Sequence, residues 1–150
     1  MPLVPHVLIA SDAQWVHDEI RSVLSAKDAS VQSVTSGRAV RGAVAERLPD
    51  LVVLDFQMAN MGAMAVSFDL RNEESGGRLA PVKVLMLLDR QADVYLAKQS
   101  KAEGWLVKPL DPMRVRRAID EVLAGRQYVD RVQLGDARAN YRPTPDSTAR

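Results

Sequence analysis

Three side chains that could do chemistry, Asp12, Asp55 and Lys108, each stand just after a short apolar run. The run at 51–54, Leu-Val-Val-Leu, leads directly into Asp55. Continuous apolar runs of this length are typical of parallel strands that are covered on both faces. In an open parallel sheet, ligands bind beyond the carboxyl ends of the strands. We therefore expect two carboxylates and one ammonium group to meet at that edge of the sheet.

This set of groups suits one class of reaction. Two neighbouring carboxylates repel each other unless a cation joins them. Oxygen ligands from one or two carboxylates, completed by water, suit Mg²⁺. A carboxylate beside such a metal ion and an ammonium group can attack a phosphoryl group, because both cations neutralise the transferring oxygens. The residues therefore indicate magnesium-assisted phosphoryl transfer to an aspartate.

The elements that must position these groups alternate between apolar runs and amphipathic stretches. In the stretch 14–26, for example, Val16, Ile20, Val23 and Leu24 recur at helical spacing. Strands are expected at 7–10, 31–34, 51–54, 82–88 and 105–107, and helices at 14–26, 38–48, 63–72, 91–102 and from 111 to about 124. Five β-α units of this kind imply an α/β fold with a parallel, doubly wound sheet and right-handed crossovers.

Three segments, in this order and spacing, resemble response-regulator receiver domains. They are VLIASD at 7–12, LVVLD at 51–55 and GWLVKP at 104–109, and the resemblance covers about 7–123. It implies a flavodoxin-like sheet with strand order 2-1-3-4-5 and five helices. It also implies that Asp55 takes a phosphoryl group from a histidine kinase, a phosphotransfer protein or a small phosphodonor.

The same resemblance assigns roles to the residues around Asp55. Asp12 would bind magnesium directly with Asp55, and the backbone carbonyl of Gln57 would add a ligand. Lys108 would pair with the phosphoryl oxygens, and the bond between Lys108 and Pro109 is expected to be cis, which is uncommon among X-Pro bonds.

Four positions depart from the family pattern, and they are Ser11, Leu88, Asp89 and Trp105. Ser11 replaces an acid that holds the metal through water, so we expect weak Mg²⁺ binding. Leu88 replaces a Ser or Thr whose hydroxyl binds the phosphoryl group, and leucine has no donor. Such a bond is worth about 1.5–3 kcal/mol, comparable to the gap between the states of a switch. Trp105 is larger than the usual Phe or Tyr at the switch position, so we expect one fixed orientation.

The carboxylate of Asp89 has two interpretations. Receivers usually carry a small residue at this position. The negative charge of Asp89 would either disfavour a phosphoryl dianion or replace, as a metal ligand, the acid missing at Ser11. The sequence does not choose between these alternatives.

The composition excludes several other classes of protein. The chain has no cysteine, which excludes disulfides, zinc-thiolate sites and thiol catalysis. A net charge of +1 gives no general attraction to nucleic acid or membranes. No apolar run approaches the roughly 20 residues of a membrane span, and the first residues lack the pattern of a secretion signal. We expect a cytoplasmic protein that binds neither nucleic acid nor a membrane.

A length of 150 residues fits one domain and a modest appendage. We expect a receiver domain at 1–125 and a disordered C-terminal tail at 126–150, which has few apolar residues to bury. No output module follows Gly125, so we expect a single-domain protein that acts through contact with a downstream protein. Homodimerisation through the fourth and fifth helices remains open.

Two functional hypotheses follow. The first is a single-domain response regulator in a phosphorelay, with Asp55 as acceptor, and it is favoured by Asp12, Asp55 and Lys108. The second is a pseudo-receiver, an interaction module that works without phosphorylation, and it is favoured by Leu88 and Asp89. We do not expect an enzyme, because an aspartyl phosphatase needs a second aspartate two residues after the first, where this chain has glutamine.

Overall fold

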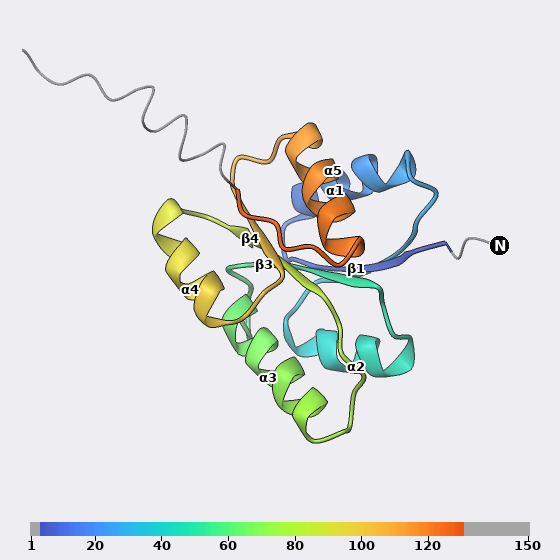
Figure 1. Ribbon diagram of the computed structural model, residues 1–150, viewed down its shortest axis with the longest axis vertical. Coiled ribbons are helices and arrows are strands. Elements are labelled where there is room, and N and C mark those ends of the chain that lie inside the picture. Colours follow the sequence, from blue (N-terminus) through green and yellow to red (C-terminus); the bar gives the residue numbers. More distant parts are fainter. Residues whose placement is uncertain (1–3, 131–150) are drawn as a thin grey trace, which may run out of the picture.

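The computed structural model describes residues 4–130, which form a parallel sheet between two layers of helices (Figure 1). The strands are β1 (His6–Ala10), β2 (Ser30–Val34), β3 (Leu51–Asp55), β4 (Val84–Leu88) and β5 (Gly104–Val107). The helices are α1 (Gln14–Ser25), α2 (Arg38–Glu46), α3 (Ala63–Ser75), α4 (Val94–Gln99) and α5 (Pro112–Leu123). The strand order β2-β1-β3-β4-β5 confirms the predicted flavodoxin-like class.

Each face of the sheet buries its own apolar cluster, because successive side chains of a strand point to opposite faces. Helices α1 and α5 cover one face, and α2, α3 and α4 cover the other (Figure 1). On β1, Val7 and Ile9 belong to the first cluster, and Leu8 and Ala10 belong to the second. Every residue of β3 and β4 is buried. This two-sided cover explains why the strands appear in the sequence as continuous apolar runs.

Several helix and strand boundaries differ from the prediction. The end of α3 and the start of β4 differ for the same physical reason. Helix α3 continues to Ser75 rather than ending at residue 72, and its last turn holds Glu74 against Arg71. Strand β4 begins at residue 84 rather than at Val82, because the N–H and C=O of Val82 bond to those same two side chains instead of to a strand. The predicted helix at 91–102 is shorter, with a 3₁₀ turn at Gln91–Asp93 before α4.

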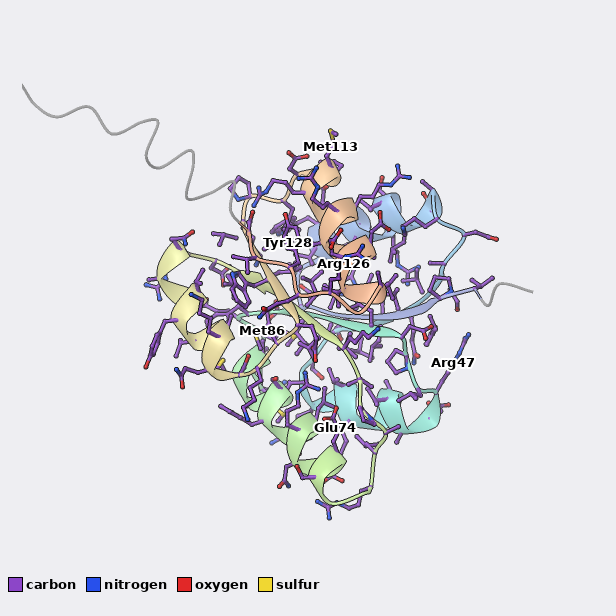
Figure 2. The ribbon with its side chains drawn as sticks, viewed as in Figure 1. Arg47, Glu74, Met86, Met113, Arg126 and Tyr128 are labelled. Atoms are coloured by element: carbon purple, nitrogen blue, oxygen red, sulfur yellow. The ribbon has the colours of Figure 1, made fainter. Side chains whose placement is uncertain are left out.

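The packed domain extends beyond the predicted boundary at residue 125. Tyr128 is buried and pairs with Gly104 in a parallel bridge (Figure 2). Glycine permits this approach, because a Cβ at Gly104 would lie 3.1 Å from the Cβ of Tyr128. The disordered tail was predicted at 126–150, and its part from residue 131 onward lies outside the described residues. Within 4–130, no helix combines the length and apolar character needed to cross a membrane.

Candidate functional site

The carboxyl ends of β1, β3 and β5 bring Ser11, Asp55 and Lys108 together. The ammonium group of Lys108 donates to Asp55 Oδ1 at 2.6 Å, and the hydroxyl of Ser11 donates to Oδ2 at 2.7 Å. Strand β3 lies at the centre of the sheet, so Asp55 is only 2% exposed. A charge buried this deeply requires pairing and hydrogen bonds. Ser11 and Lys108 provide them, one for each oxygen of the carboxylate.

Lys108 is shared between two carboxylates. Its Nζ also donates to Asp89 Oδ1 at 2.9 Å, while Asp89 Oδ2 is buried without a hydrogen-bond partner. Burial acts to lower the pKa of Lys108, but the hydrogen bonds and charges of Asp55 and Asp89 outweigh it and raise the pKa above 10.5. The ammonium also lies 5.5 Å from the ring centroid of Trp15, within cation–π range. Lys108 is therefore a permanent positive charge at neutral pH.

Asp12 lies on the exposed rim of the site. Its Oδ2 accepts a hydrogen bond from the backbone N–H of Ala59 at 2.9 Å, in the loop that follows β3. Helix α1 has Ala13 at its N-cap with no side-chain cap, so Asp12 does not cap this helix. Gln57 lies in the same loop and is exposed. The hydrogen bond to Ala59 thus ties Asp12 to the loop that contains Gln57.

These residues fit a magnesium ion that has few protein ligands. Among residues 4–130, no three His, Cys, Asp or Glu side chains are close enough to hold a metal ion by themselves. Mg²⁺, however, commonly uses one or two carboxylates and keeps several waters. The carboxylates of Asp12 and Asp55 and the carbonyl of Gln57 make up such a set. In the structure, one oxygen of Asp55 accepts from the Ser11 hydroxyl and the other from Lys108.

The two predicted switch positions, Leu88 and Trp105, are part of the apolar core. Leu88 is fully buried and Trp105 is 2% exposed, both in the cluster that faces α3 and α4. The carbonyl of Leu88 accepts from the N–H of Lys108 at 2.8 Å, which joins β4 to β5 beside the site. The peptide bond between Lys108 and Pro109 is cis, as predicted.

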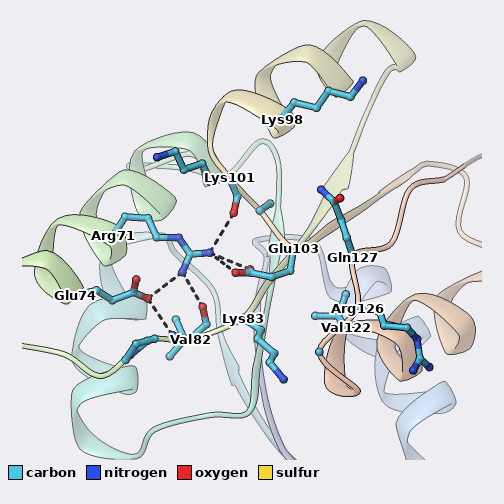
Figure 3. A pocket seen from close by; sticks show the side chains of 13 residues that line it. Arg71, Glu74, Val82, Lys83, Lys98, Lys101, Glu103, Val122, Arg126 and Gln127 are labelled. Carbon is cyan, nitrogen blue, oxygen red and sulfur yellow. Dashed lines mark hydrogen bonds and ion pairs between the residues drawn. The ribbon is translucent and has the colours of Figure 1, made fainter.

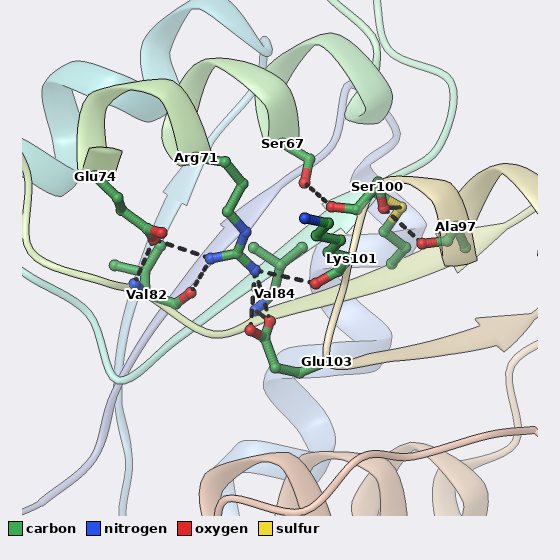
Figure 4. A network of polar contacts seen from close by, with 10 residues as sticks. Ser67, Arg71, Glu74, Val82, Val84, Ala97, Ser100, Lys101 and Glu103 are labelled. Atoms are coloured by element: carbon green, nitrogen blue, oxygen red, sulfur yellow. Dashed lines mark hydrogen bonds and ion pairs between the residues drawn. The ribbon is translucent and has the colours of Figure 1, made fainter. Parts of the chain in front are cut away.

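A second polar cluster lies at the opposite edge of the sheet, and no pattern in the sequence indicates it. Arg71 of α3 donates to Glu74 and to Glu103 at 2.9 Å each, and to the carbonyl of Val82 at 2.8 Å (Figure 4). These residues line a hollow of about 800 Å³ (Figure 3). Among the described residues that line it, none carries a hydroxyl, thiol or imidazole.

The fold and the site together define a class of protein, and comparison with known families identifies it. The model of the response regulator receiver domain matches residues 7–120. The chain therefore belongs to the response regulator receiver family of two-component signalling.

Individual relatives agree with this assignment. Response regulator protein PmrA of Pseudomonas aeruginosa is 33% identical over 80% of this chain and 54% of its own length. The nitrate/nitrite response regulator NarL of Escherichia coli is 25% identical over 96% of this chain and 66% of its own length. This chain thus spans about half to two thirds of the length of these relatives.

Solved structures show the same fold. The receiver domain of a putative response regulator NarL from Mycobacterium tuberculosis matches with a TM-score of 0.71 and 28% identity, covering 83% of this chain and 100% of that domain. A putative response regulator from Chloroflexus aurantiacus matches with a TM-score of 0.74 and 20% identity, covering 81% of this chain and 99% of the other. At that identity the second likeness concerns the fold alone.

Proposed function

We propose that this protein is a phosphorelay receiver that accepts a phosphoryl group on Asp55 and signals by contact with a downstream protein. The observation that carries the proposal is the buried Asp55 carboxylate, held at 2.6 Å by the charged Lys108 at the carboxyl edge of the sheet. Membership of the receiver family supports a histidine kinase or phosphotransfer protein as the donor.

The reaction needs one nucleophile and a compensating positive charge. A carboxylate oxygen of Asp55 attacks phosphorus, and a new O–P bond forms as the bond from phosphorus to the donor breaks. The donor leaves with the bonding electron pair, as acetate from acetyl phosphate or as neutral imidazole from a ring-protonated phosphohistidine. Lys108 keeps its proton and balances the charge on the transferring oxygens. A magnesium ion held by Asp12, Asp55 and the Gln57 carbonyl would supply further neutralisation.

Two neighbours of Asp55 restrain this chemistry. Asp89 holds Lys108 through Oδ1, so the ammonium is already engaged when a phosphoryl group arrives, and a second negative charge opposes the dianion. This pairing favours the interpretation of Asp89 as a restraint over that of a substitute metal ligand. The Ser11 hydroxyl occupies one oxygen of Asp55. We therefore expect slow phosphorylation.

A second candidate function is an interaction module that works without phosphorylation. Leu88 favours it, because a fully buried leucine offers no hydroxyl to a phosphoryl group and packs in the core instead. In this case Asp55 and Lys108 would form a structural ion pair.

Intact-mass measurement after incubation with acetyl phosphate and Mg²⁺ separates these two functions. We expect a single phosphoryl adduct on the wild-type chain and none on Asp55→Asn, which keeps the shape of the side chain and removes the nucleophile. Absence of an adduct on the wild type, under conditions that label an ordinary receiver, would contradict the first function and favour the interaction module.

A further inference from the structure

The chain beyond α5 turns back and lies along the outer edge of β5. Gly125 makes the turn with a φ of +86°, a conformation that glycine adopts without strain. The N–H of Tyr128 then donates to the carbonyl of Glu103 at 3.0 Å, and the carbonyl of Tyr128 accepts from the N–H of Trp105 at 3.3 Å. Residues 126–130 thus cover the edge of the sheet, parallel to β5 (Figure 1).

This segment ends in a buried ion pair between Asp130 and Arg114. The Asp130 side chain has no exposed surface, and that of Arg114 is 12% exposed. Asp130 Oδ2 accepts from the N–H of Val107 at 3.0 Å, as the carbonyl of an added strand would. Arg114 also donates to the carbonyls of Val107 at 3.2 Å and Pro109 at 3.3 Å. The pair therefore binds the peptide groups on both sides of Lys108.

Stability alone is a weak reason for such a pair. Removing two charges from water is unfavourable, and apolar residues of similar volume often stabilise a protein equally well. What an apolar pair could not do is bind the N–H and C=O of Val107 and the C=O of Pro109. The ion pair is therefore best explained by the backbone geometry that it fixes.

We propose that the Arg114–Asp130 pair positions Lys108 for Asp55, so that residues 126–130 set the charge arrangement of the acceptor site. This inference rests on the proposed function in that it gives Lys108 a role in phosphoryl transfer. Displacing the segment from β5 releases the peptide groups beside Lys108, and the ammonium loses its fixed place between Asp55 and Asp89.

The test compares wild type, Asp130→Asn and Arg114→Lys in the full chain. Asp130→Asn keeps an oxygen for Val107 but loses the charge that holds Arg114, and Arg114→Lys keeps the charge but cannot reach both backbone carbonyls. The matched control is Asp120→Asn, which removes the ion pair of α5 with Lys27 and no contact to residues 107–109 or 126–130. Two quantities are measured below the melting temperature of each variant: the distance from Lys108 Nζ to Asp55 Oδ1 in a crystal structure, and the rate at which acetyl phosphate labels Asp55.

We expect both test variants to move Lys108 Nζ out of hydrogen-bond distance of Asp55 and to slow labelling about fivefold, while Asp120→Asn changes neither. Folded variants in which Lys108 keeps its wild-type distance to Asp55 would overturn the positioning role. A wild-type chain that is never labelled would instead contradict the proposed function, and the position of Lys108 would still decide the inference. Arg114→Lys keeps the test available if Asp130→Asn does not fold.

Discussion

Two clusters at opposite edges of one sheet each place a single cation between two carboxylates. At the amino edge, Arg71 binds Glu74 and Glu103, and each carboxylate also accepts a backbone N–H, from Val82 at 2.9 Å and from Val84 at 2.6 Å. At the carboxyl edge, the corresponding cation is a lysine, and one oxygen of its second carboxylate is buried without a partner.

The difference indicates which cluster is the better candidate for a reactive site. Buried polar groups in proteins are normally hydrogen-bonded, so an unpaired one calls for an explanation. The Arg71 cluster is paired throughout and joins α3 to the starts of β4 and β5, which is a structural task. In the Lys108 cluster, the charges of Asp55 and Asp89 raise the pKa of the lysine, and perturbed groups of this kind gather at functional sites. The Lys108 cluster is therefore the better candidate for a reactive site, with Asp89 as a charge that would oppose an incoming phosphoryl group.

The largest effect is expected from Arg71→Ala. This change leaves Glu74 and Glu103 partly buried without a cation, which should lower the free energy of unfolding by about 2–4 kcal/mol in urea denaturation. The labelling rate of Asp55 should stay at the wild-type value. The control is Arg78→Ala, which removes an arginine that is 56% exposed and should lower the free energy of unfolding by less than about 1 kcal/mol. Equal losses in the two variants would contradict a structural role for the Arg71 cluster.

A smaller effect is expected from alkaline pH, and it sets the two clusters apart. The folded-state pKa of Lys108 is raised, so its contribution to stability is fully present below 10.5 and is lost as the pH rises through the higher folded value. Arg71 keeps its charge throughout. The free energies of unfolding of wild type and Lys108→Met, measured in urea between about pH 9 and 12, should therefore converge as the pH rises. Parallel curves would show that the charges of Asp55 and Asp89 do not hold the Lys108 proton.

Much of the acceptor site could be predicted from the sequence, because parallel strands end at a shared edge. Asp55 and Lys108 follow buried strands directly, so their meeting required only the strand order. The same reasoning predicts that Asp12, which follows the first buried strand, lies at this edge too.

The remaining features depend on side-chain pairs between distant elements, which leave no spacing pattern. The sequence indicates only that Ser11 replaces an acid. In the structure its hydroxyl donates to Asp55, which is 44 residues away in the chain. Asp130 was assigned to a tail of low apolar content, and its burial depends on Arg114 in the preceding helix. In the sequence, a charged residue that forms a buried ion pair cannot be told apart from one that stays exposed to water.

The most direct test of the account is the rate at which acetyl phosphate and Mg²⁺ label Asp55 in Asp89→Asn. The asparagine keeps the shape of the side chain and removes one of the two negative charges that pair with Lys108. We predict labelling roughly fourfold faster than wild type. At about 1.36 kcal/mol per tenfold change in rate, this lowers the activation free energy by slightly under about 1 kcal/mol. The control Asp28→Asn removes an exposed charge at a turn with a φ of +56°, which asparagine also adopts, and should label at the wild-type rate. Unchanged or slower labelling of Asp89→Asn would contradict the restraint of the acceptor by Asp89.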